Sequence, residues 1–112
     1  MGRLTTHVLD TASGKPGSGI NGQLYAIDTD IFLITEFVTN DDGRVDEPLL
    51  SEENFKCGTY ELVFNISDYF DSPQDDASFL GDVVIRFNLN KDETYHVPLL
   101  VSPWSYTTYR GS

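Results

Sequence analysis

The stretch TYELVFNI, residues 59–66, carries an apolar side chain at every second position, at Tyr60, Leu62, Phe64 and Ile66. Successive side chains of a β-strand point to opposite faces, so this spacing predicts a strand with one buried face. The stretch VVIRFNL repeats the pattern, with Val83, Ile85, Phe87 and Leu89 on one side. The two stretches favour a fold built from sheets.

The rest of the chain contains similar short β-rich segments separated by turn residues. The expected strands or extended segments are 4–9, 23–28, 31–39, 44–50, 94–101 and 104–110, and a single helical turn is expected at 66–70. In the tight turn Asn40-Asp41-Asp42-Gly43, the glycine supplies a positive φ. About seven or eight short strands predict an all-β, two-sheet β-sandwich with one short helix. The 112 residues fit a single domain, 1–112.

The composition limits the kinds of partner. Seven basic and eighteen acidic side chains give a net charge of −11. An acidic surface repels phosphate backbones and anionic lipid, so neither nucleic acid nor a membrane is an expected partner. The single cysteine, Cys57, allows no internal disulfide and no Cys-based zinc site, which fits a reducing compartment. The first residues carry no long apolar run, so we expect no signal peptide and a cytoplasmic location.

Only two histidines, His7 and His96, are available for acid–base chemistry. His96 shares a face of the expected strand 94–101 with Pro98, and His7 shares a face of the first strand with Thr5. A lone histidine on a strand is more often structural or solvated, but two from different strands can meet and activate a water. Pro98 lacks an amide hydrogen, which predicts a sheet edge or a non-bonded position.

Two arginines stand at positions suited to ligand binding. Arg44 directly follows the turn at 40–43, and its guanidinium can donate paired hydrogen bonds to a planar, oxygen-rich ligand. A solvated hairpin residue is the more common alternative. Arg110 is followed by only two residues, where a frayed end is the alternative, but the nearby Trp104 and Tyr109 are costly to leave on a disordered tail. The residues alone indicate an all-β domain with a possible His/Arg site and no defined substrate.

Four segments resemble the transthyretin-related 5-hydroxyisourate hydrolases and cover nearly the whole chain in order. They are LTTHVLDTASGKP (4–16), TNDDGR (39–44), GTYELVF (58–64) and YHVPLLVSPWSYTTYRGS (95–112). The closing tetrapeptide YRGS, residues 109–112, is the most specific part, because it ends proteins of this family. One departure is Thr94, which stands where many members have a second histidine, two residues before His96.

The resemblance implies a transthyretin-like sandwich that hydrolyses 5-hydroxyisourate, the product of urate oxidation, to 2-oxo-4-hydroxy-4-carboxy-5-ureidoimidazoline. It implies no metal and no organic cofactor. The residues it assigns to catalysis are His7, Arg44, His96 and Ser112, and those it assigns to substrate binding are Arg44, Tyr109, Arg110, Gly111 and Ser112. Which histidine is the base stays open, and Arg110 either serves the site or anchors the tail. Family members are homotetramers, dimers of dimers, with active sites in the cleft where the dimers meet.

A non-enzymatic carrier is the main alternative, because transthyretin shares the fold and binds thyroid hormone in the equivalent cleft. The set His7, Arg44, His96 and residues 109–112 favours the enzyme, because the resemblance implies that the hormone carrier lacks it. A structural β-sandwich module is a third possibility, and it predicts no dependence on the histidines.

Overall fold

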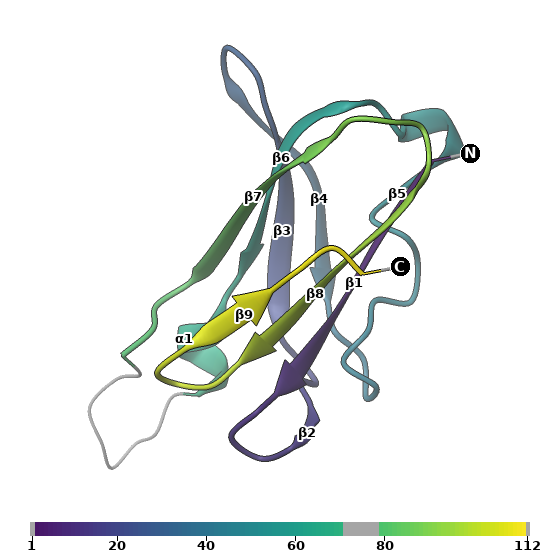
Figure 1. Cartoon of the computed structure of the whole chain (residues 1–112). Coiled ribbons are helices and arrows are strands. Elements are labelled where there is room, and N and C mark those ends of the chain that lie inside the picture. Colours follow the sequence, from purple (N-terminus) through teal and green to yellow (C-terminus); the bar gives the residue numbers. More distant parts are fainter. Residues whose placement is uncertain (1, 71–78, 112) are drawn as a thin grey trace.

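The computed structural model describes residues 2–70 and 79–111, which form two packed β-sheets (Figure 1). One sheet has the order β2 (Lys15–Pro16), β1 (Arg3–Asp10), β8 (Thr94–Val101) and β9 (Tyr106–Thr108), and β5 (Leu50–Ser51) also pairs with β1. The other has the order β4 (Ile31–Val38), β3 (Asn21–Ile27), β6 (Gly58–Phe64) and β7 (Val83–Leu89). One short helix, α1 (Ile66–Tyr69), and a 3-10 turn (Glu52–Asn54) complete the described elements. The predicted all-β two-sheet sandwich with one short helix is confirmed.

Several strand boundaries differ from the expectation. The loop at 11–19 contains β2, because Lys15 and Pro16 pair with the end of β1. The expected extended segment 44–50 forms a strand only at its end, where β5 begins, and the expected last strand 104–110 shortens to β9. These short pairings depend on a neighbouring strand and leave no alternating pattern in the sequence, so the described strands exceed the expected number.

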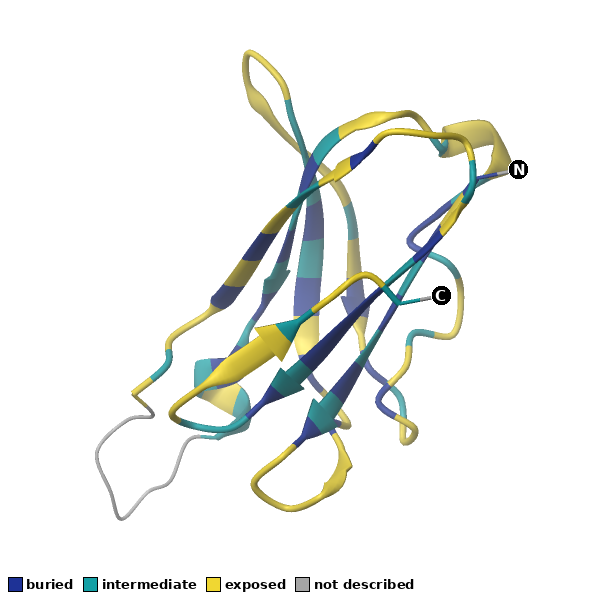
Figure 2. Cartoon of the chain, in the orientation of Figure 1, coloured by how far each residue is buried: buried dark blue, intermediate teal, exposed yellow. Residues whose placement is uncertain are grey.

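The core lies between the two sheets and is built by the predicted alternation. Leu62 and Phe64 of β6 are fully buried, as are Leu4 of β1 and Leu99 of β8. Figure 2 shows buried and less buried positions alternating along these strands. Phe64 meets Phe37 of β4 edge to face, with ring centroids 5.8 Å apart. Since each strand contributes one face to this core, the side chains of its other face are available for contacts or for a functional site.

Pro98 does not lie at a sheet edge, because β8 is flanked by β1 and β9. Leu99 pairs with Thr108 and His96 pairs with Gly111, and the same register places Pro98 opposite Tyr109. The missing amide hydrogen of Pro98 therefore falls where the ladder between β8 and the C-terminal segment is interrupted. This position agrees with the alternative expectation of a non-bonded site and explains why β9 ends at Thr108.

The central pair of strands, β1 and β8, is parallel and positions the histidines. Thr5 lies beside His96 in the register, and His7 lies beside Pro98. Their neighbours Leu4, Thr6 and Val97 are buried on the core side, whereas Thr5, His7 and His96 are only partly buried. Both histidines consequently lie on the outer face of this sheet. No helix among the residues that the structure describes is long and apolar enough to cross a membrane.

Candidate active site

His7 and His96 are in direct contact on the outer face of the sheet. His7 Nδ1 lies 2.6 Å from His96 Nε2, a hydrogen-bond distance that requires one of the two nitrogens to carry the proton. The rings are nearly parallel, with centroids 4.8 Å apart and 17° between their planes. Parallel pairing of β1 with β8 brings together two side chains that are 89 residues apart in the chain.

Thr5 extends this contact into a chain of three side chains. Its hydroxyl oxygen lies 2.7 Å from His96 Nδ1, so both ring nitrogens of His96 have a partner. His7 Nε2 has no partner among the described residues. The sequence placed Thr5 on the same face as His7, but its contact with His96 was not predicted, because the register between the two strands is a tertiary property.

Arg44 reaches the histidine face from the turn at 40–43. Gly43 has a φ of +74°, as predicted, and an added Cβ would lie 2.4 Å from the carbonyl oxygen of Val8. That carbonyl belongs to β1, and the Val8 amide donates to the Gly43 carbonyl at 2.8 Å. The turn is thus docked against β1, and the backbone of Arg44 forms a bridge with His7. Only glycine fits this close approach.

Asn40 holds the turn in shape. Its side-chain oxygen accepts from the Asp42 amide at 2.9 Å and from the Arg44 amide at 3.1 Å. Its amide group donates to Asp46 at 2.9 Å. These bonds fix the backbone of Arg44, while its guanidinium makes no ion pair or hydrogen bond with the described residues and is exposed. A guanidinium on a fixed backbone, with no partner among the described residues, is suited to binding a ligand.

The electrostatics of the site favour neutral imidazoles. Burial lowers the pKa of His7, and the neighbouring His96 and Arg44 lower it further. Burial also lowers the pKa of His96, and the charge of Arg44 adds to this effect. A neutral imidazole can accept a proton, so the pair is prepared for base chemistry near pH 7. No group of three or more potential metal ligands occurs in the described part of the chain.

The C-terminal segment packs directly on His96. After β9 the chain continues along β8, and the Gly111 amide donates to the His96 carbonyl at 2.6 Å (Figure 1). A Cβ at Gly111 would lie 2.9 Å from His96 Cδ2 and 3.2 Å from the His96 carbonyl oxygen. Glycine at this position therefore lets the tail lie against the imidazole. Ser112, which was predicted to act in catalysis, lies outside the described residues.

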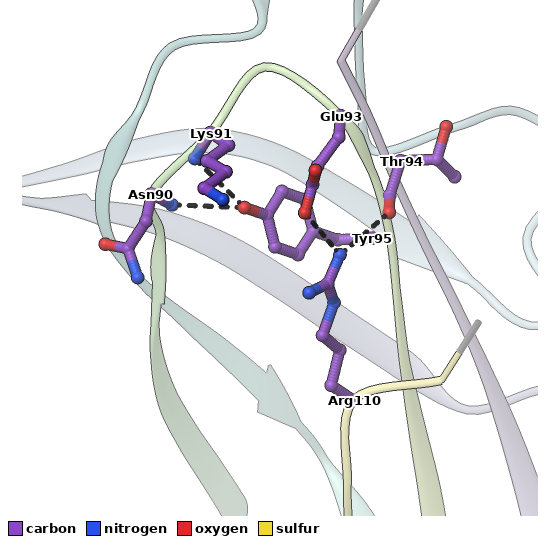
Figure 3. A network of polar contacts seen from close by, with 6 residues as sticks. All are labelled: Asn90, Lys91, Glu93, Thr94, Tyr95 and Arg110. Carbon is purple, nitrogen blue, oxygen red and sulfur yellow. Dashed lines mark hydrogen bonds and ion pairs between the residues drawn. The ribbon is translucent and has the colours of Figure 1, made fainter.

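Arg110 points away from the histidines in this chain. Its guanidinium donates to Glu93 Oε1 at 2.7 Å and lies 4.3 Å from the centre of the Tyr95 ring (Figure 3). Arg110 and Tyr109 help to line a cavity of about 200 Å³ between the sheets, together with Ile85, Phe87, Tyr95 and Val97. The cavity does not include His7, His96 or Arg44. Of the two earlier alternatives for Arg110, the geometry matches the tail anchor.

Comparison with known proteins identifies the family of the chain. A family model described as the HIUase/Transthyretin family matches residues 4–111. The chain belongs to the HIUase/Transthyretin family. Among its relatives, the 5-hydroxyisourate hydrolase of Pseudomonas aeruginosa is 51% identical over 117 residues, which cover 100% of this chain and 93% of the relative. The family predicted from the four segments is confirmed.

Solved structures of the HIUase/Transthyretin type confirm the predicted transthyretin-like fold. An (S)-allantoin synthase is 43% identical with a TM-score of 0.88, and the match covers 99% of this chain and 44% of that one. Sea bream transthyretin in complex with thyroxine is 25% identical with a TM-score of 0.87, over 97% of this chain and 94% of that one. The same sandwich thus occurs in both an enzyme and a hormone-binding protein.

Proposed function

We propose that this chain hydrolyses 5-hydroxyisourate to 2-oxo-4-hydroxy-4-carboxy-5-ureidoimidazoline in urate breakdown. The observation that carries the proposal is the 2.6 Å contact of His7 with His96 beside Arg44, whose guanidinium has no partner in the described part of the chain. It occurs in a chain that is 51% identical to a 5-hydroxyisourate hydrolase over its whole length. A histidine pair and a guanidinium are suited to activating water and binding a flat, carbonyl-rich ring, and this supports the proposal.

We assign the general base to His7. Both ring nitrogens of His96 are occupied, by Thr5 and by His7, so His96 has no free lone pair for a substrate water. His7 Nε2 is the nitrogen of the pair that lacks a partner among the described residues. With its pKa lowered, His7 is neutral near pH 7 and can take a proton, and positioned base catalysis is worth roughly 10²–10⁴-fold in rate.

Arg44 is proposed to orient the substrate and stabilise the developing negative charge. Water transfers a proton to His7 as its oxygen bonds to the carbonyl carbon C6 of the six-membered ring. The C6–N1 bond then breaks as protonated His7 returns its proton to N1, and C6 is left as a carboxylic acid, which releases a proton to solvent and becomes a carboxylate. A guanidinium beside the carbonyl oxygen donates hydrogen bonds to the oxyanion of the intermediate, and such donors contribute roughly 10²–10³-fold. The net charge of −11 makes this local cation necessary for an electron-rich substrate.

We also propose that the chain works as a homotetramer, a dimer of dimers, with the histidine face in the cleft where the dimers meet. Two features support this. Two of the edge strands, β7 and β9, expose Val84 and Tyr106, and Trp104 is exposed nearby. The cavity lined by Tyr109 and Arg110 does not include His7 or His96, and both histidines lie on the outer face of the sheet, where a second copy can enclose a substrate.

The tail residues Tyr109, Gly111 and Ser112 are proposed to complete the site in that assembly, with Arg110 anchoring the tail and Ser112 contributing its hydroxyl or terminal carboxylate. The position of Gly111 against His96 supports this. A fusion partner added after Ser112 is expected to impair turnover more than the same partner added before Met1. Equal activity of the two fusions would remove the tail from the site. The single, unpaired cysteine supports a reducing compartment, which we infer to be the cytoplasm.

The decisive experiment generates 5-hydroxyisourate in place with urate oxidase and follows its ultraviolet decay. The purified protein is expected to accelerate that decay strongly above the spontaneous rate. An unchanged decay rate would contradict the enzyme and would favour the carrier alternative, which the likeness to thyroxine-bound sea bream transthyretin keeps open. Calorimetry with thyroxine then tests the carrier directly, and we expect no binding at micromolar concentrations.

A further inference from the structure

A continuous chain of hydrogen bonds joins Thr5, His96 and His7. The two histidines alone do not fix which partner of each bond donates the proton. The distances are 2.7 Å from the Thr5 hydroxyl to His96 Nδ1 and 2.6 Å from His96 Nε2 to His7 Nδ1. A neutral imidazole carries one N–H and one lone pair. The two rings must therefore point their protons the same way along the chain, and two arrangements are possible.

In the first arrangement each N–H points toward Thr5. His7 Nδ1–H donates to His96 Nε2, His96 Nδ1–H donates to the Thr5 oxygen, and His7 Nε2 keeps its lone pair. In the second arrangement the Thr5 hydroxyl donates to His96 Nδ1, His96 Nε2–H donates to His7 Nδ1, and His7 Nε2 carries the proton. Only the first arrangement leaves His7 able to act as a base.

We propose that Thr5 is a positioning residue for the hydrolysis, whose hydroxyl oxygen accepts from His96 Nδ1–H and thereby keeps the lone pair on His7 Nε2. The proposal rests on the proposed function, because it assumes that His7 takes the proton of the water. Thr5 acts only through His96. Without its oxygen, the Nδ1–H of His96 would lack an acceptor in a partly buried place. Moving the proton to His96 Nε2 removes this unsatisfied donor, but it puts a proton on His7 Nε2 and blocks the base.

The neutrality of Thr5 matters as much as its position. A carboxylate at this place also accepts from His96 Nδ1–H, but its charge favours protonated imidazoles. Arg44 from the turn at 40–43 counteracts protonation, and Arg3 lies on the same face of β1 as Thr5. A hydroxyl orients the pair and leaves it neutral near pH 7, so that the base is ready before the substrate binds.

The test compares Thr5→Val, Thr5→Ser and Thr5→Asp with the unaltered protein. Thr5→Val removes the oxygen at nearly constant size, and we expect a roughly 10-fold lower kcat with little change in KM, because a hydrogen bond to an ionising group is lost. Thr5→Ser restores the oxygen and should recover most of the rate. In Thr5→Asp the carboxylate should still accept from His96 Nδ1–H. Its charge favours protonated imidazoles, so the acid limb of the pH–rate profile should move to higher pH.

The imidazole ¹⁵N chemical shifts give an independent readout, because they distinguish an N–H nitrogen from a lone-pair nitrogen. In the unaltered protein His96 Nδ1 and His7 Nδ1 should carry protons, and Thr5→Val should move both rings toward Nε2–H. Thr11→Val is the matched control. It removes a hydroxyl that bonds to the Val101 carbonyl at the far end of β8, and it should change neither the shifts nor kcat.

Unchanged ¹⁵N shifts in Thr5→Val would overturn the proposal, whether or not the rate falls, because a purely structural loss does not move protons along the rings. If Thr5→Val does not fold, the pH–rate profile of Thr5→Asp decides, and an acid limb at the original pH overturns it. A failure of the proposed hydrolysis can be told apart from a failure of the role proposed for Thr5, because the ¹⁵N shifts report on Thr5 without substrate.

Discussion

Two polar clusters lie on opposite faces of the sheet at β8, and they differ in whether their charged groups are paired within the protein. On the core-facing side, near the tail, the polar groups are paired with one another: Arg110 bonds to Glu93 and lies over Tyr95, whose hydroxyl accepts from the amides of Asn90 and Lys91 (Figure 3). On the outer face, His7 Nε2 and the Arg44 guanidinium have no partner in the described part of the chain.

This difference separates a structural cluster from a chemical one. Both clusters contain an arginine that the sequence indicated as a substrate ligand, but only one arginine is already satisfied by the protein. A paired charge has little left to offer a ligand, whereas a charge that is fixed by its backbone and left unpaired is available. The comparison supports the proposed role of Arg44 in the reaction and an anchoring role of Arg110 in the tail.

The largest effect is expected from removing the base. His7→Ala should lower kcat by roughly 10²–10⁴-fold, because the water loses its proton acceptor. His7 is only partly buried, so circular dichroism and the melting temperature should stay close to those of the unaltered protein. Steady-state kinetics on freshly generated 5-hydroxyisourate measure the loss. Near-normal turnover by this variant would transfer the base assignment to another group.

The two arginines should respond differently to the same replacement. Arg44→Lys keeps the charge but loses the planar pair of donors, and we expect kcat/KM to fall by roughly 100-fold. Arg110→Lys is the matched control, because its role is an ion pair that lysine can also make, and its kcat/KM should change less than threefold, which is about 0.7 kcal/mol. Equal losses in the two variants would break the distinction between the clusters.

Gly111 joins the two clusters, and its replacement should disturb the histidine site from the side of the tail. In Gly111→Ala the new Cβ would come 2.9 Å from His96 Cδ2, so either the tail or the imidazole must shift. We expect roughly a 10-fold lower kcat, because small displacements of catalytic groups are costly. Ala substitution at Gly81, where a Cβ meets nothing within 4 Å, is the control. An unaffected Gly111→Ala would show that the contact tolerates the methyl group.

The pH dependence follows from the lowered pKa values of both histidines. Their ordinary value is about 6.5, so the acid limb of kcat/KM should lie below pH 6.5, where an unperturbed histidine would already be half protonated. Between the lowered and the ordinary value the unfolded chain binds more protons than the folded one, and stability should therefore fall as the pH drops below about 6.5. Titration of the two histidines by NMR checks that their pKa values are lowered. Arg44→Ala should raise both pKa values. Titrations above pH 6.5 in the unaltered protein would contradict it.

The smallest effect is expected from the paired cluster. Glu93→Gln removes an ion pair whose side chains are 57% and 43% exposed, so the free energy of unfolding should fall by at most about 1 kcal/mol. The melting temperature should fall by a few degrees, and kcat should stay the same. A double-mutant cycle with Arg110→Ala isolates the coupling. A large loss of activity in Glu93→Gln would mean that tail anchoring and catalysis are not separate.

Neighbouring residues in the sequence determined the main strands and the turn at 40–43. Period-two alternation predicted the strands around 59–66 and 83–89, because each apolar side chain must reach the same core. The same alternation placed His7 on one face with Thr5 and His96 on one face with Pro98, and the turn at 40–43 predicted the positive φ of Gly43. These features depend on neighbours in the chain, so the sequence by itself was sufficient for them.

Only the tertiary structure decided which of these groups meet. The register of β1 against β8 puts His7 against His96 across 89 residues and brings Thr5 to His96 Nδ1. It also left Pro98 inside the sheet and turned Arg110 toward Glu93, on the other side of the strand from the histidines. Register between distant strands is fixed by the packing of the whole core, which no short stretch of sequence contains.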